Sequence, residues 1–354
     1  MATHITVAKF GGTSIQDSAA FKRVVQIVKA KQRRPLVIVV SAMSGVTDAL
    51  IASFHGAATH GADRSLAPLE QHFARHLRVG ESLNAKRFAR LEKLIDVTRA
   101  ELHELLVRAA HSRSSDLRLY DAIVSHGERL SANLLTLVLA EHGLPAEYVD
   151  ARRCVITNDK HGDAEPLLEE VRQRTPAELL LLLNTKRIPV LGGFIGATRK
   201  GVTTTLGRGS SDYSATLIGA ALHAREIEIW TDVAGIQTAD PRLVKTTRTV
   251  PHVSYAEAAQ LAKLGARVMH SKMIEPVVAQ RIPIRILNSQ APDQPGTLIS
   301  GESSHANGVK AIAHRMAGES AIVGCIVHGL KINFRVETGS VDAVVRQLHA
   351  AIFE

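Results

Sequence analysis

The sequence predicts an α/β fold around a mostly parallel sheet. Short β-branched runs alternate with longer amphipathic stretches along most of the chain, as repeated strand-helix-strand units do. Apolar runs at residues 6–10 and 36–40 enclose residues 18–31, which carry Phe and Val at helical spacing. Because ligands bind open α/β sheets at the carboxyl ends of strands, the loops at residues 11–14 and 41–47 are the first candidates for a site.

The composition indicates a globular protein. A length of 354 residues suggests two to three domains, or one large α/β domain with an appendage. With 45% hydrophobic and 22% charged residues, the chain is not disordered, collagen-like or a disulfide scaffold. The net charge of +9 suits an anionic partner without identifying it. Aromatic residues make up only 4%, which argues against a base-stacking surface, so we expect no nucleic acid partner.

Cysteine usage and apolar runs limit the site and the location. The two cysteines, Cys154 and Cys325, lie far apart with no Cys/His cluster, so neither structural zinc nor any other protein-held metal site is predicted. No export signal is recognisable, and the apolar run at residues 179–183 is far shorter than the roughly 20 residues of a membrane span. We therefore expect a cytoplasmic protein without a membrane partner.

The remaining elements of the first half follow from periodicity and turn residues. Residues 49–115 read as a helical hairpin lying over the sheet. Further along, the pattern predicts a helix at 121–140, a strand at 147–149, and a β-hairpin at 198–205 that turns at Lys200 and Gly201.

The second half is predicted to complete the sheet and add a small unit. A helix at 254–264 begins with Ser254 three residues before Glu257, the spacing of a capping box. The other predicted elements are helices at 213–224 and up to about residue 280, strands at 227–231 and 284–287, a polar linker at 301–308, strand pieces at 321–327 and 331–336, and a helix at 341–352.

Two glycine-containing loops are candidate anion sites. Lys9 stands at a strand end beside Gly11 and Gly12, where backbone N–H groups and an ammonium could approach a phosphate, although a plain turn is the alternative. It is not a Walker loop. In the second loop, Arg208 and Asp212 flank small residues that open a predicted helix, which suits an anion; a flexible loop with a capping side chain is the alternative.

One acidic residue is a candidate for holding an ammonium group. Glu128 lies in the first half of the helix predicted at 121–140, where its carboxylate could bind a substrate amine. The alternative is a surface glutamate favoured by the helix dipole. His126 has no second ligand at metal spacing and is interpreted as structural.

Taken in order, these motifs resemble the aspartate kinases of the amino-acid-kinase superfamily. The resemblance covers residues 4 to about 300, and the opening KFGGTS motif distinguishes this family from its carbamate, acetylglutamate and uridylate kinase relatives. The matching stretches are KFGGTS at 9–14, VVSAMSGVT at 39–47, SHGE at 125–128, GGFIG at 192–196, GRGSSDYSA at 207–215, WTDVAGI at 230–236, TADPR at 238–242 and GARVMH at 265–270.

The resemblance implies a three-layer α/β/α sandwich and an ATP-dependent, Mg²⁺-assisted phosphorylation of the aspartate β-carboxylate, the entry to lysine, threonine and methionine. In such chemistry the protein supplies positioning and charge stabilisation. By resemblance, Lys9 with Gly11 and Gly12 stabilises the transferring phosphoryl group. The expected aspartate-binding residues are Ser41, Thr47, Glu128, Arg208 and Asp212. The expected nucleotide-binding residues are Thr231, Asp232, Gln237, Arg242, Arg267 and Val268.

Four positions depart from the family pattern. Gln237 stands where a Tyr is usual near the adenine, Arg267 replaces a Lys, and Ser271 replaces a Pro. Ser210 replaces a Gly, which is tolerable only if that backbone does not need a positive φ. Two alternatives therefore stay open: a paralogue that phosphorylates another small amino-acid carboxylate, and a catalytically silent amino-acid-binding subunit.

The resemblance also divides the chain. It implies a catalytic domain at 1–300, with an acceptor-binding lobe to about 190 and a nucleotide-binding lobe from 191, followed by the linker at 301–308. Family members commonly carry two regulatory ACT modules, whereas residues 309–354 match only the start and the end of such a pair. We expect an incomplete ACT-like segment, a homodimer formed through it, and weak or absent feedback inhibition by lysine or threonine.

Overall fold

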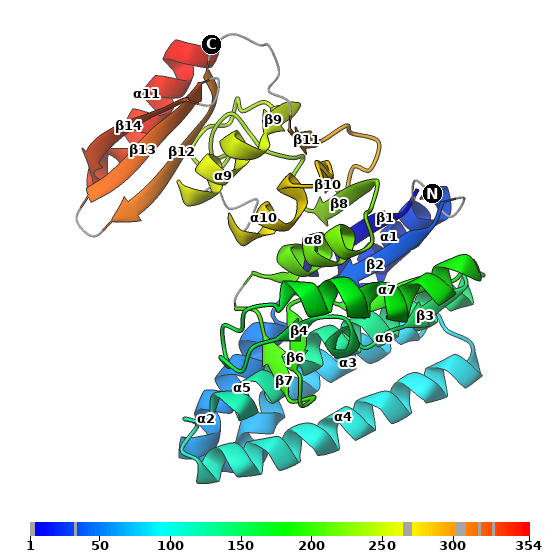
Figure 1. Ribbon diagram of the computed structural model, residues 1–354. Helices are drawn as coiled ribbons and strands as arrows, with labels where there is room; N and C mark the ends of the chain where they lie inside the picture. The colour runs from blue at the N-terminus through cyan, green and yellow to red at the C-terminus, as the bar shows by residue number, and fades with distance from the viewer. Residues whose placement is uncertain are drawn as a thin grey trace.

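The centre of the molecule is an eight-stranded, mostly parallel sheet (Figure 1). The computed structural model describes residues 4–31, 34–207, 209–264, 271–301, 309–317, 320–327 and 330–354. The strand order is β3-β5-β2-β1-β8-β10-β11-β9, and the pairing of β10 with β11 is antiparallel. The strands are β1 (Thr6–Phe10), β2 (Leu36–Val40), β3 (Ala146–Tyr148), β5 (Ile188–Gly192), β8 (Glu226–Thr231), β9 (His252–Ser254), β10 (Ile284–Asn288) and β11 (Thr297–Ser300).

Helices cover both faces of this sheet and produce the predicted three-layer α/β/α sandwich. The α-helices are α1 (Ser18–Lys31), α2 (Val46–Leu66), α3 (Glu70–Gly80), α4 (Ala85–His111), α5 (Leu117–Val124), α6 (His126–Glu141), α7 (Leu168–Asn184), α8 (Ser211–Ala221), α9 (Tyr255–Lys263), α10 (Glu275–Val278) and α11 (Val341–Phe353). Helix α6 packs on β2, β3 and β5, with α1 beside it, whereas α7 and α8 pack together against β1, β2, β5 and β8. Because both faces are covered, β1, β2 and β5 are buried along their whole length.

Short elements complete the fold. A second small sheet has the order β4-β6-β7, from β4 (Ile156–Thr157), β6 (Ile195–Thr198) and β7 (Thr203–Thr205), and contains the predicted hairpin. The 3-10 turns are η1 (Gly12–Ile15), η2 (Ala67–Leu69), η3 (Ala151–Arg153), η4 (Ser271–Met273) and η5 (Thr338–Ser340).

The structure corrects several element boundaries. The helical hairpin predicted at 49–115 is three helices, α2 to α4, and it packs mainly against α5 and α6. Asn84 begins the third of these helices because its side chain accepts a hydrogen bond from the Arg87 N–H. The helix predicted at 121–140 is broken at Ser125 into α5 and α6. Helix α7 and strands β4, β9 and β11 were not predicted, whereas the capping box of Ser254 and Glu257 is confirmed.

The C-terminal residues form a small α+β unit, as predicted for this segment. Strands β12 (Val309–Ala317), β13 (Ser320–Val327) and β14 (Leu330–Glu337) make an antiparallel sheet. One sheet face packs on α9, where a Cβ at Gly324 would lie 2.5 Å from Leu264 Cδ1. The other face packs on α11, with Val323 and Val345 buried in a shared cluster.

Polar contacts attach this unit to the loop that follows β8. Ile312 donates its N–H to the Thr238 carbonyl at 2.8 Å, and Thr238 Oγ1 lies 3.0 Å from His349 Nε2. A second contact joins β12 to α9. Lys310 forms a buried ion pair with Glu257, with Nζ 2.9 Å from Oε2. The segment is therefore fixed to the same half of the molecule that contains β8 and α9.

We expect Lys310→Met to lower the free energy of unfolding by about 3 kcal/mol, because it leaves the buried Glu257 carboxylate without its cation. Chemical denaturation of the purified chain measures this loss. The double variant Lys310→Met/Glu257→Gln removes both charges and is expected to recover most of the stability. A double variant as unstable as the single one would show that charge pairing is not what stabilises this junction.

Candidate active site at the carboxyl edge of the sheet

Four strand ends and two helix N-termini converge at one edge of the central sheet. The loops after β1, β2, β5 and β8 leave this edge together, because these strands are neighbours and parallel. Helices α6 and α8 begin there and bring Glu128 and Asp212 in their first turns. The N–H groups of a helix N-terminus favour anions. This edge is therefore the place where the predicted residues can meet.

Lys9 and Asp212 form an ion pair at this edge. Lys9 Nζ lies 2.6 Å from Asp212 Oδ1, and the two side chains are 10% and 14% exposed. Lys9 is near the end of β1, in register with Val39 and Ile229 of the flanking strands, so the sheet fixes its backbone on both sides. A largely desolvated ammonium held in this way is a strong, localised positive charge.

Glycines allow the surrounding backbones to approach one another. A Cβ at Gly12 would lie 2.8 Å from the Ala42 carbonyl oxygen, and one at Gly127 would lie 2.8 Å from Ala42 Cβ. A Cβ at Gly193 would lie 2.8 Å from Ser211 Cβ, and one at Gly192 would lie 2.9 Å from Glu128 Cβ. Any side chain at these positions would push apart the elements that carry Lys9, Glu128 and Asp212.

The amide of Gly11 changes one expectation about the first loop. Its N–H donates to the Trp230 carbonyl at 3.0 Å and so is already used within the protein. A Cβ at Gly11 would lie 3.6 Å from Lys9 Nζ. The residue therefore leaves space beside the ammonium rather than offering a free backbone donor.

Glu128 is buried, so the interpretation as a surface glutamate is wrong. The side chain accepts hydrogen bonds from the backbone, yet Glu128 Oε2 has no hydrogen-bond partner among the described residues. Burial raises the pKa of Glu128 to about 8, against the opposing effects of backbone N–H groups, including that of Ala42, and the charge of Lys9. A buried carboxyl group with an unused oxygen is suited to a cationic ligand.

The second glycine-containing loop can be followed except at its centre. Arg208 lies outside the described residues. On either side of it Gly207 and Gly209 have φ values of 83° and 77°, which require glycine. Ser210 has a φ of −85°, so serine is accommodated there, and its hydroxyl donates to the Leu206 carbonyl at 2.7 Å. The departure at Ser210 therefore does not distort the start of α8.

The other predicted acceptor residues lie on the loop after β2. Ser41 is half-buried, and its N–H donates to the Phe10 carbonyl at 3.1 Å, which fixes it beside the end of β1. Thr47 is half-buried in the first turn of α2, after Gly45, whose φ is 81°. Both residues thus lie on the loop after β2 or on α2, which Gly12 and Gly127 approach closely.

The predicted nucleotide-binding residues follow β8. Thr231 and Asp232 stand at its end, with Thr231 Oγ1 donating to Asp232 Oδ1 at 3.1 Å. Gln237 donates from Nε2 to Thr249 Oγ1 at 3.0 Å. Arg242 is exposed and pairs with Asp240, donating from Nε at 2.9 Å. Arg267 and Val268 lie outside the described residues.

A pair of hydroxyl groups that the sequence patterns did not indicate links the ends of β1, β8 and β10. Ser14 Oγ lies 2.8 Å from Ser289 Oγ, and Ser289 donates to the Thr231 carbonyl at 3.1 Å. Ser14 was inside a recognised motif, and Ser289 directly follows the strand β10, so the strand-end rule could have indicated both. His126 is structural, as predicted: Nδ1 lies 2.9 Å from the Ala122 carbonyl and Nε2 lies 3.0 Å from Glu101.

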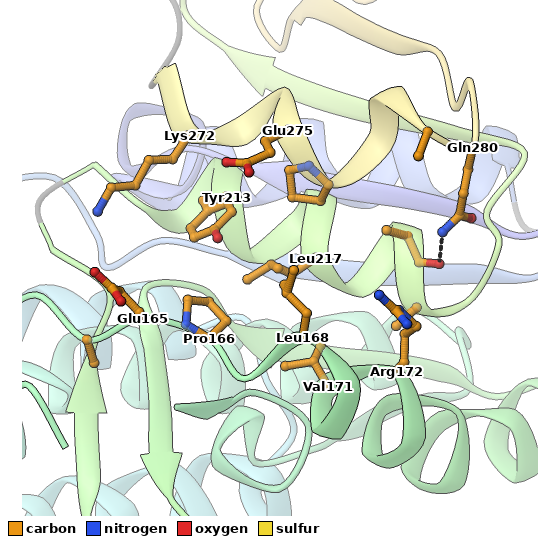
Figure 2. Close-up of a pocket in the computed structure, with 15 residues that line it drawn as sticks. Glu165, Pro166, Leu168, Val171, Arg172, Tyr213, Leu217, Lys272, Glu275 and Gln280 are labelled. Carbon is orange, nitrogen blue, oxygen red and sulfur yellow. Dashed lines mark hydrogen bonds between the residues drawn. The ribbon is translucent and has the colours of Figure 1, made fainter. Parts of the chain in front are cut away.

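A cavity of about 510 Å³ lies elsewhere, between α7, α8 and α10 (Figure 2). Tyr213 and Leu217 of α8 point into it from one side, and Leu168 and Val171 of α7 from another. None of the predicted site residues lines it. Apolar and charged side chains both line the cavity, and no residue of the loops after β1, β2, β5 and β8 is among them.

Among the described residues, no group of three or more His, Cys, Asp or Glu side chains could hold a metal ion. Within the same parts of the chain, no helix combines the length and the apolar character needed to cross a membrane.

Comparison with known proteins agrees with this geometry. Residues 4–288 match the sequence profile of the amino acid kinase family. The chain is 38% identical over 323 residues to lysine-sensitive aspartokinase 3 of Escherichia coli, covering 88% of this chain and 68% of that protein. It is 34% identical over 293 residues to an aspartokinase of Chlamydia muridarum, covering 83% of this chain and 63% of that protein. The chain therefore spans about two thirds of the length of these relatives.

The fold matches solved structures of the same kind. The crystal structure of Escherichia coli aspartokinase III in complex with aspartate and ADP aligns with a TM-score of 0.87 and 27% identity, covering 99% of this chain and 100% of that one. An aspartate kinase of Clostridium acetobutylicum aligns with a TM-score of 0.69 and 26% identity, covering 88% of this chain and 66% of that one.

We expect Glu128→Gln to stabilise the ligand-free protein at pH 8 and to leave its stability at pH 5 nearly unchanged. Because the pKa of Glu128 is raised from 4.5 to about 8, the folded state binds its proton more tightly than the unfolded state. Stability from this group is therefore lost as the pH rises from about 4.5 to 8. Thermal unfolding of both proteins at the two pH values measures the difference; equal melting temperatures at pH 8 would contradict the buried assignment.

Proposed function

Because the chain belongs to the amino acid kinase family, and within it to the aspartokinases, we propose that it is an ATP-dependent aspartate kinase. It would transfer the γ-phosphoryl group of ATP to the β-carboxylate of L-aspartate and form 4-phospho-L-aspartate and ADP. The observation that carries this proposal is the meeting of Lys9, Asp212 and the buried Glu128 at one edge of the sheet. The product would enter the synthesis of lysine, threonine and methionine.

Lys9 would stabilise the negative charge of the phosphoryl group during its transfer. In the reaction the bond from the γ-phosphorus to the ADP oxygen breaks, and a bond from phosphorus to a β-carboxylate oxygen forms. Negative charge gathers on the transferring oxygens, and a fixed ammonium lowers the barrier there. Asp212 keeps Lys9 in place at 2.6 Å until the substrates arrive. The acceptor carboxylate is already ionised at neutral pH, so the step needs no general base.

The acceptor would be held by its α-amino and α-carboxylate groups. Glu128 and Asp212 are the carboxylates at the site edge that can bind the ammonium, and Glu128 Oε2 has an unused acceptor position. Arg208, which precedes α8 in the sequence, would donate two parallel hydrogen bonds to the α-carboxylate. Ser41 and Thr47 would line the rest of the pocket. Binding of the ammonium would return Glu128 to its ionised form.

The nucleotide would lie over the segment after β8, near Thr231, Asp232, Gln237 and Arg242, with Arg267 and Val268. Mg²⁺ fits this donor set if the ATP phosphates and water supply most of its ligands, because the described carboxylates do not form a cluster of their own. When bound, the ion would neutralise the β- and γ-phosphate oxygens. Asp212, whose Oδ1 lies 2.6 Å from Lys9 Nζ, is a carboxylate that could supply one ligand to the ion.

The domain organisation and assembly are part of the same proposal. Residues 1–300 would form the catalytic domain, with lobes dividing near residue 190, and residues 309–354 an incomplete ACT-like unit after the linker at 301–308. Strand β14 is at the edge of its sheet and exposes Phe334, so the unit could associate with a second copy in a dimer. A cytoplasmic location stays a prediction.

Lys9→Ala is expected to lower kcat by at least about 100-fold, because it removes the charge that stabilises the transferring phosphoryl group. The assay combines Mg-ATP, aspartate and hydroxylamine, which traps the acyl phosphate as a hydroxamate. Lys29→Ala, at an exposed position on α1, is the matched control and should retain full activity.

A panel of acidic amino acids in this assay separates the alternatives. Product from another acid but none from aspartate would favour a paralogous kinase. Binding of aspartate without product from any acid would favour a silent subunit. Equal activity of Lys9→Ala and the unaltered chain would contradict the proposed role of Lys9.

Inhibition by lysine or threonine is expected to be weak or absent, because the described residues of the C-terminal unit form three strands and one α-helix, less than the pair of ACT modules expected from the family resemblance. Steady-state rates with either amino acid at millimolar concentration measure this. Strong inhibition of the purified chain by either one would show that an effector site is complete without further ACT elements.

A further inference from the structure

A second cavity, of about 550 Å³, lies beside the small sheet β4-β6-β7, and its lining contains charged, hydroxyl and amide side chains. None of the residues proposed above for catalysis or substrate binding lines it. Basic and hydroxyl or amide side chains dominate its wall, namely Arg118, Thr157, Asn158, His161, Arg199 and Lys200. The cavity therefore has no role in the aspartate kinase reaction proposed above.

His161 lines one side of the cavity, and its imidazole ring contacts the buried carboxylate of Asp121. His161 Nδ1 lies 2.8 Å from Asp121 Oδ2, with side-chain exposures of 12% and 0%. The carboxylate orients the ring so that Nδ1 carries a proton, which leaves Nε2 for a ligand. Nε2 has no hydrogen-bond partner among the described residues and would donate to an anion when the ring is protonated.

Two further elements contribute cationic side chains to the lining of the cavity. Arg118 comes from α5, and Arg199 and Lys200 from the turn between β6 and β7. Arg118 and Arg199 are 68% and 71% exposed and contact Asp116 and Glu170 through part of each guanidinium, which has five donors in all. Within the described residues Lys200 makes no ion pair. The exposed Asp159 is the acidic residue in the lining.

The same carboxylate connects this cavity to the acceptor loop. Asp121 Oδ1 accepts a hydrogen bond from Thr205 Oγ1 at 2.5 Å, and the Gly162 N–H lies 3.1 Å from both carboxylate oxygens. Thr205 ends β7, two residues before Gly207 and three before Arg208. Asp163 also touches this loop, since a Cβ at Gly207 would lie 2.7 Å from Asp163 Oδ1. A shift of His161 would therefore displace the described residues Thr205 and Gly207, which precede Arg208 in the sequence.

We propose that this cavity binds a small molecule carrying a phosphate dianion, through His161, Lys200 and the guanidinium groups of Arg118 and Arg199. Donors arriving from α5, from the loop after β4 and from the β6–β7 turn suit a tetrahedral anion better than a planar carboxylate. Binding changes the affinity for the acceptor substrate through Asp121 and Thr205, and the acceptor changes the affinity for the anion by the same factor.

Isothermal titration calorimetry of the full chain with inorganic phosphate, at constant ionic strength and without ATP or aspartate, tests the site. We expect saturable binding that weakens about tenfold or more in Lys200→Ala and in His161→Gln. Lys93→Ala, at an exposed position on α4, is the matched control for the loss of a surface charge and should bind as the unaltered chain does. Lys9→Ala should also retain binding, because Lys9 belongs to the other site.

Several results would overturn the proposal. Absence of saturable binding, equal weakening by Lys93→Ala, or loss of binding in Lys9→Ala would each show that the cavity is not the phosphate site. Malonate binding as tightly as phosphate would overturn the choice of a tetrahedral anion. A KM for aspartate that phosphate does not change, or changes equally in Lys200→Ala, would overturn the coupling. Calorimetry needs no turnover, so a failure of the proposed kinase activity would be seen separately.

Discussion

The close approach of four strand ends and two helix N-termini is the constraint on which the site depends. Glycines at positions 12, 127, 192 and 193 permit it, since a Cβ at any of them would come within 3.0 Å of a neighbouring residue. The approach places the Lys9 ammonium 2.6 Å from Asp212. It also buries Glu128, whose pKa rises to about 8 because its charge is desolvated. Packing and chemistry are therefore set by the same few backbone contacts.

Burial of Glu128 lowers the stability of the ligand-free protein and strengthens the binding of a cationic ligand. A buried carboxyl group with an unused oxygen costs stability unless a cation reaches it. An amino-acid ammonium would supply that cation and convert the cost into affinity. The C-terminal unit is attached to the loop after β8 through Thr238, which meets both Ile312 and His349. Motion of that unit would therefore reach the proposed nucleotide segment first.

Sequence patterns predicted the elements that carry the site better than the elements around it. Strands β1 and β2 and helix α1 were predicted with their observed bounds, because short apolar runs and a clear amphipathic face leave little ambiguity. Glu128 was recognised through its motif, but its burial was not, because Gly192 and Ala42 come from distant parts of the chain. The two-residue strand β4 carries too few residues for a periodic signal. The bond from Thr205 to Asp121 spans 84 positions and has no local signature.

The most direct test of the central claim follows oxygen from acceptor to product. Aspartate labelled with ¹⁸O in its β-carboxylate is incubated with the full chain and Mg-ATP, and ³¹P NMR observes the acyl phosphate. The account predicts a new phosphorus resonance with the upfield isotope shift of an ¹⁸O bridge between carbon and phosphorus. Formation of inorganic phosphate alone, or an acyl phosphate without the isotope shift, would contradict phosphoryl transfer to that carboxylate.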